Sequence, residues 1–191
     1  MNYAVYIRPL TLSDSETSYR WRNNPEVWKY TGARPDRLIT PELEREWLAA
    51  CLARTDEYRF AICLKTTGQY IGNVQLIQIK NNNAQFHMFI GEQQFWGKGI
   101  GKQATALTLE MAFENLHLDS VNLSVNKNNH AAMEIYRKMQ FQKMGEGEVF
   151  IEMVLTRKMY KKYYPISILG FRLSRVAASV YIGFNKMLEI F

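Results

Sequence analysis

One stretch of the chain has the residue types to bind an anion, and it reads Trp96-Gly97-Lys98-Gly99-Ile100-Gly101-Lys102. Glycine at every second position allows backbone turns that a Cβ would forbid, so successive N–H groups can converge on an anion. Apolar residues at helical spacing follow over 103–116, and the N-terminus of that helix would direct its positive dipole end at the same place. The stretch predicts a pyrophosphate site; the alternative is a tight strand-to-helix turn that binds nothing.

Two common phosphate-binding motifs do not fit this stretch. A Walker loop requires Ser or Thr after the lysine, but Lys102 is followed by Gln103. A dinucleotide fingerprint requires a Gly-x-Gly-x-x-Gly spacing, and the three glycines here are separated by single residues. The predicted ligand is therefore neither a nucleoside triphosphate in a Walker loop nor a dinucleotide.

The composition indicates one globular domain with an appendage. The chain has 191 residues, of which 47% are hydrophobic, enough to bury a substantial core. Its first residues have neither a basic nor an apolar leader region, which predicts a cytoplasmic protein. Cys51 and Cys63 have no clustered Cys or His partners, so we expect buried reduced thiols and no metal site.

The net charge of +6 lies in the C-terminal part of the chain. Residues 157–191 contain seven Lys or Arg and one Glu, so residues 1–156 are neutral overall. The high pI is therefore poor support for nucleic-acid binding by the main domain, and no nucleic-acid-binding motif is present. We expect an α/β domain over 1–156 and a basic helical extension over 157–191.

The elements expected along the chain alternate between sheet and helix. A strand over 3–10 precedes a helix that begins near Thr11 or Ser13, and Thr40-Pro41 marks a further helix start. Since the strand over 120–125 is reached by a crossover, we expect it to be parallel to its predecessor. The remaining predictions are strands over 58–64, 69–79, 84–90, 141–144 and 148–155, a short helix over 26–30 and a helix over 131–139 that starts at Asn128 or Asn129.

A second motif follows the glycine stretch by about thirty residues. Asn129, Ala132, Tyr136, Lys138 and Phe141 resemble the second acetyl-coenzyme A motif of the GNAT N-acetyltransferases. The glycine stretch resembles the first motif of that family, Gln/Arg-x-x-Gly-x-Gly/Ala. The departures are Trp for Gln or Arg at the first position of the loop, and Gln for Gly before the phenylalanine of the second motif. The resemblance covers residues 3–155 and stops before the extension.

The resemblance implies a fold and a co-substrate. The fold is a mixed, mostly antiparallel sheet that is splayed at its centre, with helices on both faces, and the pantetheine arm of acetyl-CoA lies in the splay. The glycine loop would bind the pyrophosphate, the end of the preceding strand would pair with the pantetheine amides, and no metal is required. The residues expected at the cofactor are Phe89, Ile90, Gly91, Trp96, Gly97, Lys98, Gly99, Ile100, Gly101, Lys102, Asn129 and Tyr136.

The resemblance also suggests catalytic residues. Tyr136 would protonate the departing thiolate; its alternative role is that of a core tyrosine. Many relatives have a glutamate base on the strand before the loop, but Gln85 stands at that position and cannot accept a proton. His87 lies two residues on, on the same face of the strand, and with an ordinary pKa of about 6.5 it could be the base or be structural. An acceptor amine of low pKa would need no base.

The acceptor is suggested by the run Trp21-Arg22-Asn23-Asn24-Pro25-Glu26-Val27. It is similar to a stretch in two GNAT branches, which acetylate nucleotide-linked amino sugars and the N-termini of ribosomal proteins. We favour the amino sugar, because arginine recognises a diphosphate with its bidentate fork. Arg22 could instead pair with Glu26 on its helix, and the aromatic residues could simply pack helices onto the sheet. The residues expected at the acceptor are Trp21, Arg22, Tyr30, Arg34 and Gln85, with Trp28 nearby.

Two questions stay open at the level of sequence. A non-catalytic module that binds acyl-CoA is an alternative of another class, although the presence of Asn129 and Tyr136 argues against it. The extension over 165–191 is amphipathic, but its longest uncharged run is too short to span a bilayer. It would lie on an anionic membrane surface, at the inner membrane face, or dock on a second subunit or on its own domain.

Overall fold

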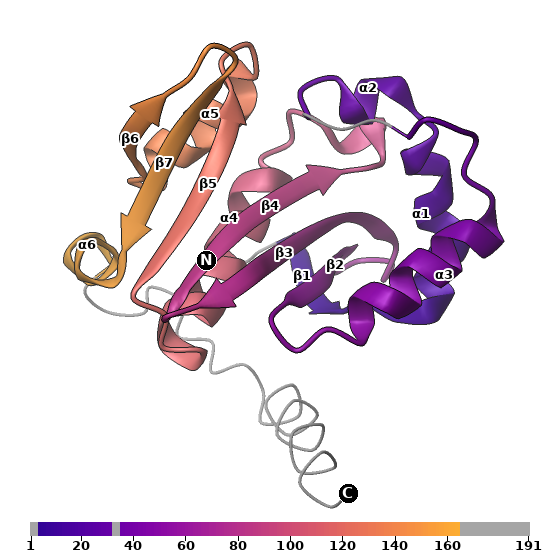
Figure 1. Cartoon of the computed structure of the whole chain (residues 1–191), viewed down its shortest axis with the longest axis horizontal. Coiled ribbons are helices and arrows are strands. Elements are labelled where there is room, and N and C mark those ends of the chain that lie inside the picture. The colour runs from indigo at the N-terminus through magenta and orange to yellow at the C-terminus, as the bar shows by residue number, and fades with distance from the viewer. Residues whose placement is uncertain (1–3, 32–34, 165–191) are drawn as a thin grey trace, which may run out of the picture.

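The computed structural model describes residues 4–31 and 35–164, and the strands within them form a seven-stranded sheet (Figure 1). The strand order is β1-β2-β3-β4-β5-β7-β6, and every neighbouring pair is antiparallel except β4 and β5. The expected mixed, mostly antiparallel sheet is confirmed. The strands are β1 Val5–Pro9, β2 Tyr58–Leu64, β3 Tyr70–Lys80, β4 Asn83–Ile90, β5 Ser120–Asn126, β6 Gln142–Glu146 and β7 Phe150–Thr156.

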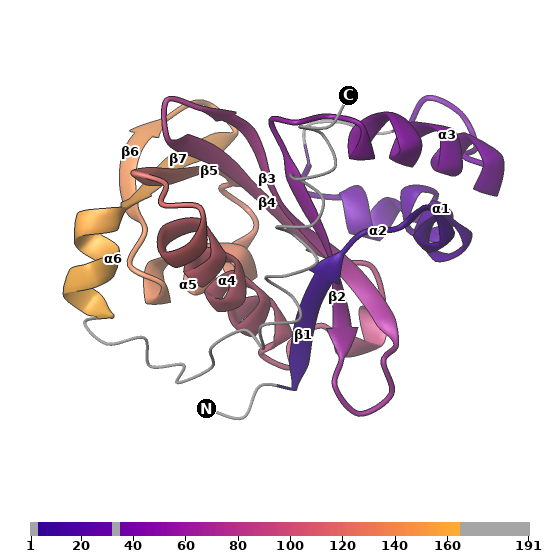
Figure 2. The same cartoon turned by 90° about the horizontal axis from the view of Figure 1, so that it is seen from below.

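Helices cover both faces of this sheet (Figure 2). One face carries α4 Ile100–Glu110, α5 His130–Lys138 and α6 Arg157–Tyr163, and the other carries α1 Ser15–Arg22, α2 Pro25–Trp28 and α3 Pro41–Leu52. Short 3-10 turns occupy Leu12–Asp14 and Gln93–Phe95, and α4 continues as a π-helical turn over Met111–Asn115. The larger core lies between the sheet and α4, α5 and α6, and a smaller one lies under α3.

Local sequence signals explain most element boundaries. The predicted start of α3 is confirmed, since the Thr40 side chain accepts a hydrogen bond from the N–H of Leu43 and Pro41 occupies the first turn. α4 begins at Ile100, three residues earlier than expected. Its N-cap is Gly99, whose φ of 73° lies in the left-handed region, so the end of the glycine stretch, residues 100–102, forms the first helical turn.

The pairing between β4 and β5 produces the predicted splay. The two strands are parallel, as expected, but they pair only over Asn83–Gln85 and Ser120–Asn122. β4 continues to Ile90 and β5 to Asn126 without pairing with each other, and Figure 1 shows them diverging towards the top of the view. We call this unpaired region the splay. It opens between two halves of the sheet, β1–β4 and β5–β7.

Strand alternation assigns the side chains of β4 to the two faces. Phe86 belongs to the core under α4 and α5, where its ring contacts that of Tyr136. Phe89 projects the other way, because its ring contacts Trp21 and Trp28 of α1 and α2. Successive residues of a strand point to opposite faces, so His87 shares the face of Phe89.

The boundary between the domain and its extension stays a prediction at 156/157. The first part of the extension forms α6, whose Tyr160 is buried against Phe113 with ring centroids 4.8 Å apart. The predicted amphipathic segment 165–191, with its membrane and dimer alternatives, lies outside the described residues. Within the part of the chain that the structure describes, no helix is long and apolar enough to cross a membrane.

Gly91, directly after β4, is required by the packing of α1. A Cβ at this position would overlap the indole ring of the buried Trp21. We expect Gly91→Ala to lower the free energy of unfolding by roughly 2–3 kcal/mol, because the overlap forces α1 away from the sheet. Urea denaturation would measure this. Gly147→Ala is the matched control, since its Cβ would come no closer than 3.7 Å to its neighbours; equal stability of the two variants would contradict the prediction.

Candidate active site

The glycine loop forms an open anion site at the start of α4. Gly97 and Gly99 have φ values of 72° and 73°, and no atom of the other described residues, chain neighbours aside, lies within 4 Å of the Cβ that either would carry. The first backbone N–H to bond back into the helix is that of Gln103, to the Gly99 carbonyl oxygen at 3.3 Å. The N–H groups of the first turn, residues 100–102, are therefore available to an anion.

Gly101 does not form part of the backbone turn, although all three glycines were expected to do so. It lies within α4 and does not have a positive φ. A Cβ there would come 3.0 Å from Cδ1 of Ile135 and 3.2 Å from Cε of Met88. Its small size therefore lets the first turn of α4 approach α5 and β4 closely, whereas Gly97 and Gly99 supply the turn itself.

The end of β4 presents backbone groups to the splay. The N–H of Gly91 donates to the carbonyl oxygen of Ile71 at 2.8 Å, so Gly91 bonds towards β3. Backbone groups alternate between the two edges of a strand, which turns those of Ile90 and Met88 towards the splay. The Ile90 carbonyl oxygen already accepts the indole N–H of Trp96 at 2.8 Å. Phe89, Ile90 and Gly91 were predicted to pair with the pantetheine arm, but of these only Ile90 directs its backbone N–H and C=O groups towards the splay. Met88 does so too and was not predicted.

Asn129 is the N-cap of α5, which resolves the alternative between Asn128 and Asn129. Its side-chain oxygen accepts the N–H of Ala132 at 3.1 Å. This bond uses the oxygen and leaves the side-chain NH₂ group as the donor that could reach a ligand. The predicted contact with the pantetheine arm stays a prediction.

Tyr136 lies in the core beside the splay. Its side chain is 7% exposed, and its ring makes edge contacts with Phe86 at 6.0 Å and Phe141 at 5.7 Å. Its hydroxyl forms no hydrogen bond with any described residue. Burial raises the pKa of Tyr136, so the phenol keeps its proton at every pH at which the protein would be assayed.

His87 lies on the opposite face of β4. Its side chain is exposed on one side, and the surrounding protein lowers its pKa by desolvation, with a further contribution from the cation of Arg59. The imidazole is therefore neutral near pH 7 and able to accept a proton. Gln85, two residues earlier, pairs with Asn122 at the last rung before the splay.

His87 and Tyr136 thus lie on opposite faces of the sheet. This arrangement suits acyl transfer, in which the amine attacks one side of a thioester carbonyl carbon and the sulfur departs from another. A group that removes a proton from the amine and a group that protonates the sulfur must then be separate. The sequence predicted both residues, but their placement on two faces follows from the tertiary structure.

Trp21 is chiefly structural. Its side chain is 3% exposed, covers Gly91, and contacts Tyr70 with ring centroids 4.6 Å apart. Its indole N–H donates to Oε1 of Glu92 at 3.0 Å. Tyr30 is half-buried beside Lys29, whose Nζ lies 5.7 Å from the ring centroid. The predicted acceptor residue Arg34 lies outside the described residues.

Arg22 is held between two tryptophans. Its guanidinium carbon lies 4.9 Å from the ring centroid of Trp28 and 4.6 Å from that of Trp47. Its Nε lies 3.4 Å from Oε2 of Glu44, too poorly aligned for a hydrogen bond. The alternative pairing with Glu26 is wrong, because Glu26 pairs with Lys29 at 3.7 Å. No sequence signal pointed to Glu44 or Trp47, which come from another helix.

Glu44 is a buried carboxylate in α3 and is 2% exposed. Its Oε1 accepts a hydrogen bond from the hydroxyl of Ser18 at 2.7 Å. Burial raises the pKa of Glu44, while Ser18 and the charge of Arg22 act in the opposite direction. Ser18, Glu44 and Arg22 therefore form a small polar cluster that fixes the guanidinium between the indoles.

Neither cysteine contributes to this site. Cys51 and Cys63 are both buried free thiols, and burial raises the pKa of each. Across residues 4–31 and 35–164, no group of three or more His, Cys, Asp or Glu side chains is placed to hold a metal ion.

The family follows from a comparison with known domains. Residues 4–142 match the family described as "Acetyltransferase (GNAT) domain". The chain belongs to the GNAT acetyltransferase family. It is an N-acetyltransferase that uses acetyl-CoA as co-substrate.

Curated relatives of this GNAT enzyme include several N-acetyltransferases. Spermidine N(1)-acetyltransferase of Escherichia coli K12 is 27% identical over an alignment of 157 residues, gaps included, that covers 75% of this chain and 76% of that protein. The probable N-acetyltransferase YjcK of Bacillus subtilis is 30% identical over 149 residues, covering 74% of this chain and 82% of YjcK. Uncharacterized protein MJ1062 of Methanocaldococcus jannaschii is 26% identical over 145 residues, 75% of this chain but only 29% of that longer protein.

Solved structures confirm the fold of the GNAT enzyme. Spermidine N-acetyltransferase from Vibrio cholerae, in complex with CoA and spermine, superposes with a TM-score of 0.75 at 22% identity over 83% of this chain and 99% of that one. Apo FdhC, described as a nucleotide-linked sugar GNAT, has a TM-score of 0.73 at 21% identity over 86% and 96%. At this level of identity the likeness shows the fold alone.

Proposed function

We propose that this N-acetyltransferase transfers the acetyl group to the primary amine of a nucleotide-linked amino sugar, by direct attack in a ternary complex. The choice of this acceptor rests on the position of Arg22, whose guanidinium lies between the rings of Trp28 and Trp47. This guanidinium forms part of a hollow of about 280 Å³ whose charged lining residues, among those described, are Arg22 and Arg37. Two cations beside half-buried aromatic side chains suit a diphosphate and a nucleobase.

The proposed position of acetyl-CoA follows from the free backbone groups. The pyrophosphate would bind the N–H groups of residues 100–102 and the open loop at Gly97 and Gly99. The pantetheine arm would pair with Met88 and Ile90 in the splay, as an added strand would. Asn129, at the start of α5, would donate its side-chain NH₂ group to the same arm.

The chain supplies both proton transfers. Neutral His87 would accept the proton that the attacking amine loses, directly or through a water molecule. Tyr136 would donate its phenolic proton to the sulfur as the C–S bond breaks and the C–N bond forms. The positions of these groups on opposite faces of β4 allow both transfers in one ternary complex.

A polyamine is the second candidate acceptor. A neighbouring hollow of about 330 Å³ includes the acidic residues Asp36, Glu44 and Glu46 beside Arg22 and Arg37. Several of the similar proteins are spermidine N-acetyltransferases. However, Glu44 is already engaged by Ser18 and Arg22, so the acidic character available to a polyamine is weaker than the three carboxylates suggest.

Arg22→Lys tests the acceptor assignment. Lysine keeps a cation near Glu44 but lacks the planar fork that stacks between the indoles and binds phosphate bidentately. We expect the KM for a nucleotide-linked 4-amino-4,6-dideoxy sugar to rise by about 10- to 50-fold, with the KM for acetyl-CoA unchanged. Lys29→Ala, directly after α2, is the control. An unchanged KM for the sugar would contradict a phosphate contact at Arg22.

The acceptor itself is best identified with a thiol-release assay. The panel consists of the 4-amino-4,6-dideoxy nucleotide sugar, peptides with N-terminal alanine or serine, and spermidine. Turnover confined to the sugar would support the proposed function. Turnover confined to spermidine would favour the second candidate, and turnover confined to peptides would replace both with N-terminal acetylation. Binding of acetyl-CoA without turnover of any amine would favour a module that only binds acyl-CoA.

A further inference from the structure

The half of the sheet formed by β5, β7 and β6 has a polar face opposite α5. Gln85 of β4 is paired with Asn122 of β5, and Ser124 of β5 is paired with Glu152 of β7. Paired residues project to the same side of a sheet, and so do residues two apart on one strand. Asn122, Ser124 and Glu152 therefore share the face of His87. In Figure 1, α5 lies behind these strands, and no described helix lies in front of them.

Glu152 is a carboxylate on this face that a neighbouring hydroxyl group orients. It is exposed, and its Oε1 accepts a hydrogen bond from the hydroxyl of Ser124 at 2.6 Å. Its other oxygen has no partner among residues 4–31 and 35–164. Nearby Glu146 differs, because it pairs with both Lys127 and Lys143. Glu152 is thus oriented by Ser124 and forms no ion pair with a described residue.

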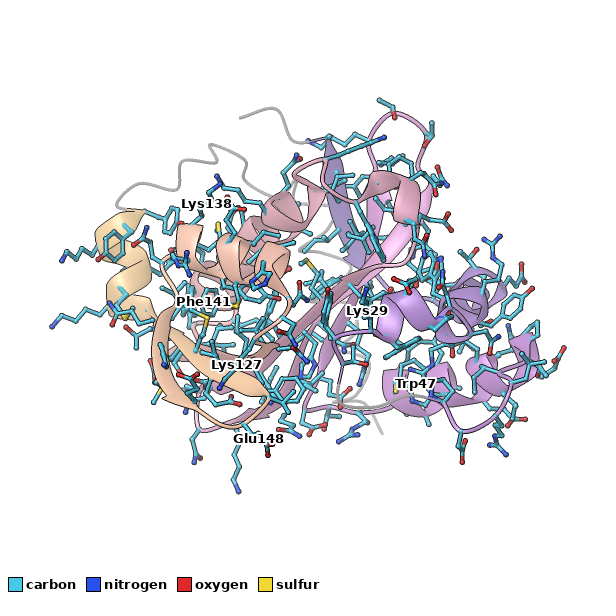
Figure 3. The ribbon with its side chains drawn as sticks, turned by 90° about the horizontal axis from the view of Figure 1, so that it is seen from above. Lys29, Trp47, Lys127, Lys138, Phe141 and Glu148 are labelled. Atoms are coloured by element: carbon cyan, nitrogen blue, oxygen red, sulfur yellow. The ribbon has the colours of Figure 1, made fainter. Side chains whose placement is uncertain are left out.

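Glu152 lies one strand away from the splay, at the level where the splay begins. Ser124 lies two residues beyond Asn122, the last residue of β5 that pairs with β4, which corresponds to about 7 Å along the strand. Glu152 is the partner of Ser124 on the next strand. Figure 3 looks from above onto this opening, with Lys127 and Phe141 labelled in one half and Lys29 and Trp47 in the other.

We propose that Glu152, oriented by Ser124, binds the ammonium group of the acceptor before acetyl transfer. An acceptor amine arrives in its protonated form, and a carboxylate one strand from the splay would hold it near the thioester. The bound ammonium releases one proton to water, and its neutral nitrogen then forms the C–N bond and passes a second proton to His87. As the C–S bond breaks, Tyr136 protonates the sulfur, and the proton on His87 restores the phenol through water. This inference rests on the proposed position of acetyl-CoA in the splay.

Glu152 also gives the acceptor site opposite charges in its two halves. Arg22 and Arg37 lie in the half that contains α1 and α3, whereas Glu152 lies on β7. A substrate with phosphates at one end and an ammonium at the other would be oriented by both. A nucleotide-linked amino sugar has this distribution of charge, whereas spermidine has cations only.

The test uses two coenzyme A thioethers that need no knowledge of the acceptor. S-(3-aminopropyl)-coenzyme A carries an ammonium beyond the sulfur, and S-propyl-coenzyme A is its uncharged counterpart. We expect calorimetry to show that the wild-type enzyme binds the ammonium compound about 5- to 10-fold more tightly. In Glu152→Gln this preference should disappear while the affinity for the propyl compound stays the same, and Ser124→Ala should reduce the preference by about half.

Glu148→Gln is the matched control. Glu148 is exposed at the end of the β6–β7 hairpin and points outward in Figure 3, so its removal changes the net charge equally without touching the splay. We expect this variant to keep the full preference. Equal binding of both compounds by the wild type, or an equal loss in both variants, would overturn the role of Glu152. Failure of the propyl compound to bind would instead overturn the placement of coenzyme A.

Discussion

Tyr136→Phe is expected to lower kcat by about 10²- to 10³-fold while the KM for acetyl-CoA changes less than about twofold. A positioned general acid contributes an effect of this size, because the thiolate leaves more readily when its sulfur is protonated during bond breaking. Burial raises the pKa of Tyr136, so the wild-type phenol stays protonated through the neutral and mildly alkaline range. The measurement is steady-state thiol release with the acceptor that the panel identifies.

The variant should fold normally, which makes the loss of activity interpretable. The ring contacts with Phe86 and Phe141 do not involve the hydroxyl, so we expect the free energy of unfolding to change by less than about 1 kcal/mol. Tyr163→Phe, at the exposed end of α6, is the control and should keep full activity. A wild-type kcat in the Tyr136→Phe variant would show that Tyr136 is only a core residue.

Gly99→Val is expected to raise the KM for acetyl-CoA by at least about 100-fold. Gly99 has a φ of 73°, a conformation that a β-branched residue adopts only with strain. Its side chain would also extend into the open space in front of the N-terminus of α4, where the pyrophosphate is expected to bind. Calorimetric titration with coenzyme A would measure the loss directly, because no acceptor is needed.

Gly68→Val separates backbone strain from loss of the anion site. Gly68 has nearly the same φ, 72°, but lies in the turn between β2 and β3, with the hydroxyl of Tyr6 as its nearest neighbour at 3.9 Å. Both variants should lose similar stability, and only Gly99→Val should lose affinity for coenzyme A. Equal affinity in the two variants would show that the loop does not bind the pyrophosphate.

The element order and the two motifs could be predicted from short stretches of sequence. β2 begins and ends at the predicted residues, and Thr40-Pro41 starts α3 as expected, because alternation, capping residues and turn residues are local signals. The glycine spacing likewise predicted an open loop before a helix. The predicted start of α4 was wrong by three residues, because the left-handed turn at Gly99 ends the loop and the helix begins at the next residue, Ile100.

Which side chains meet depends on the packing of distant elements. Glu44 and Trp47 reach Arg22 from a helix about twenty residues away, and no sequence pattern links an arginine to a partner on a packed neighbour. Placing Glu152 on the face of His87 required the register of three strands, because a shift of one residue would turn each side chain to the other face. Local order is encoded in short-range spacing, whereas the composition of the site depends on strand pairing and helix packing over long separations.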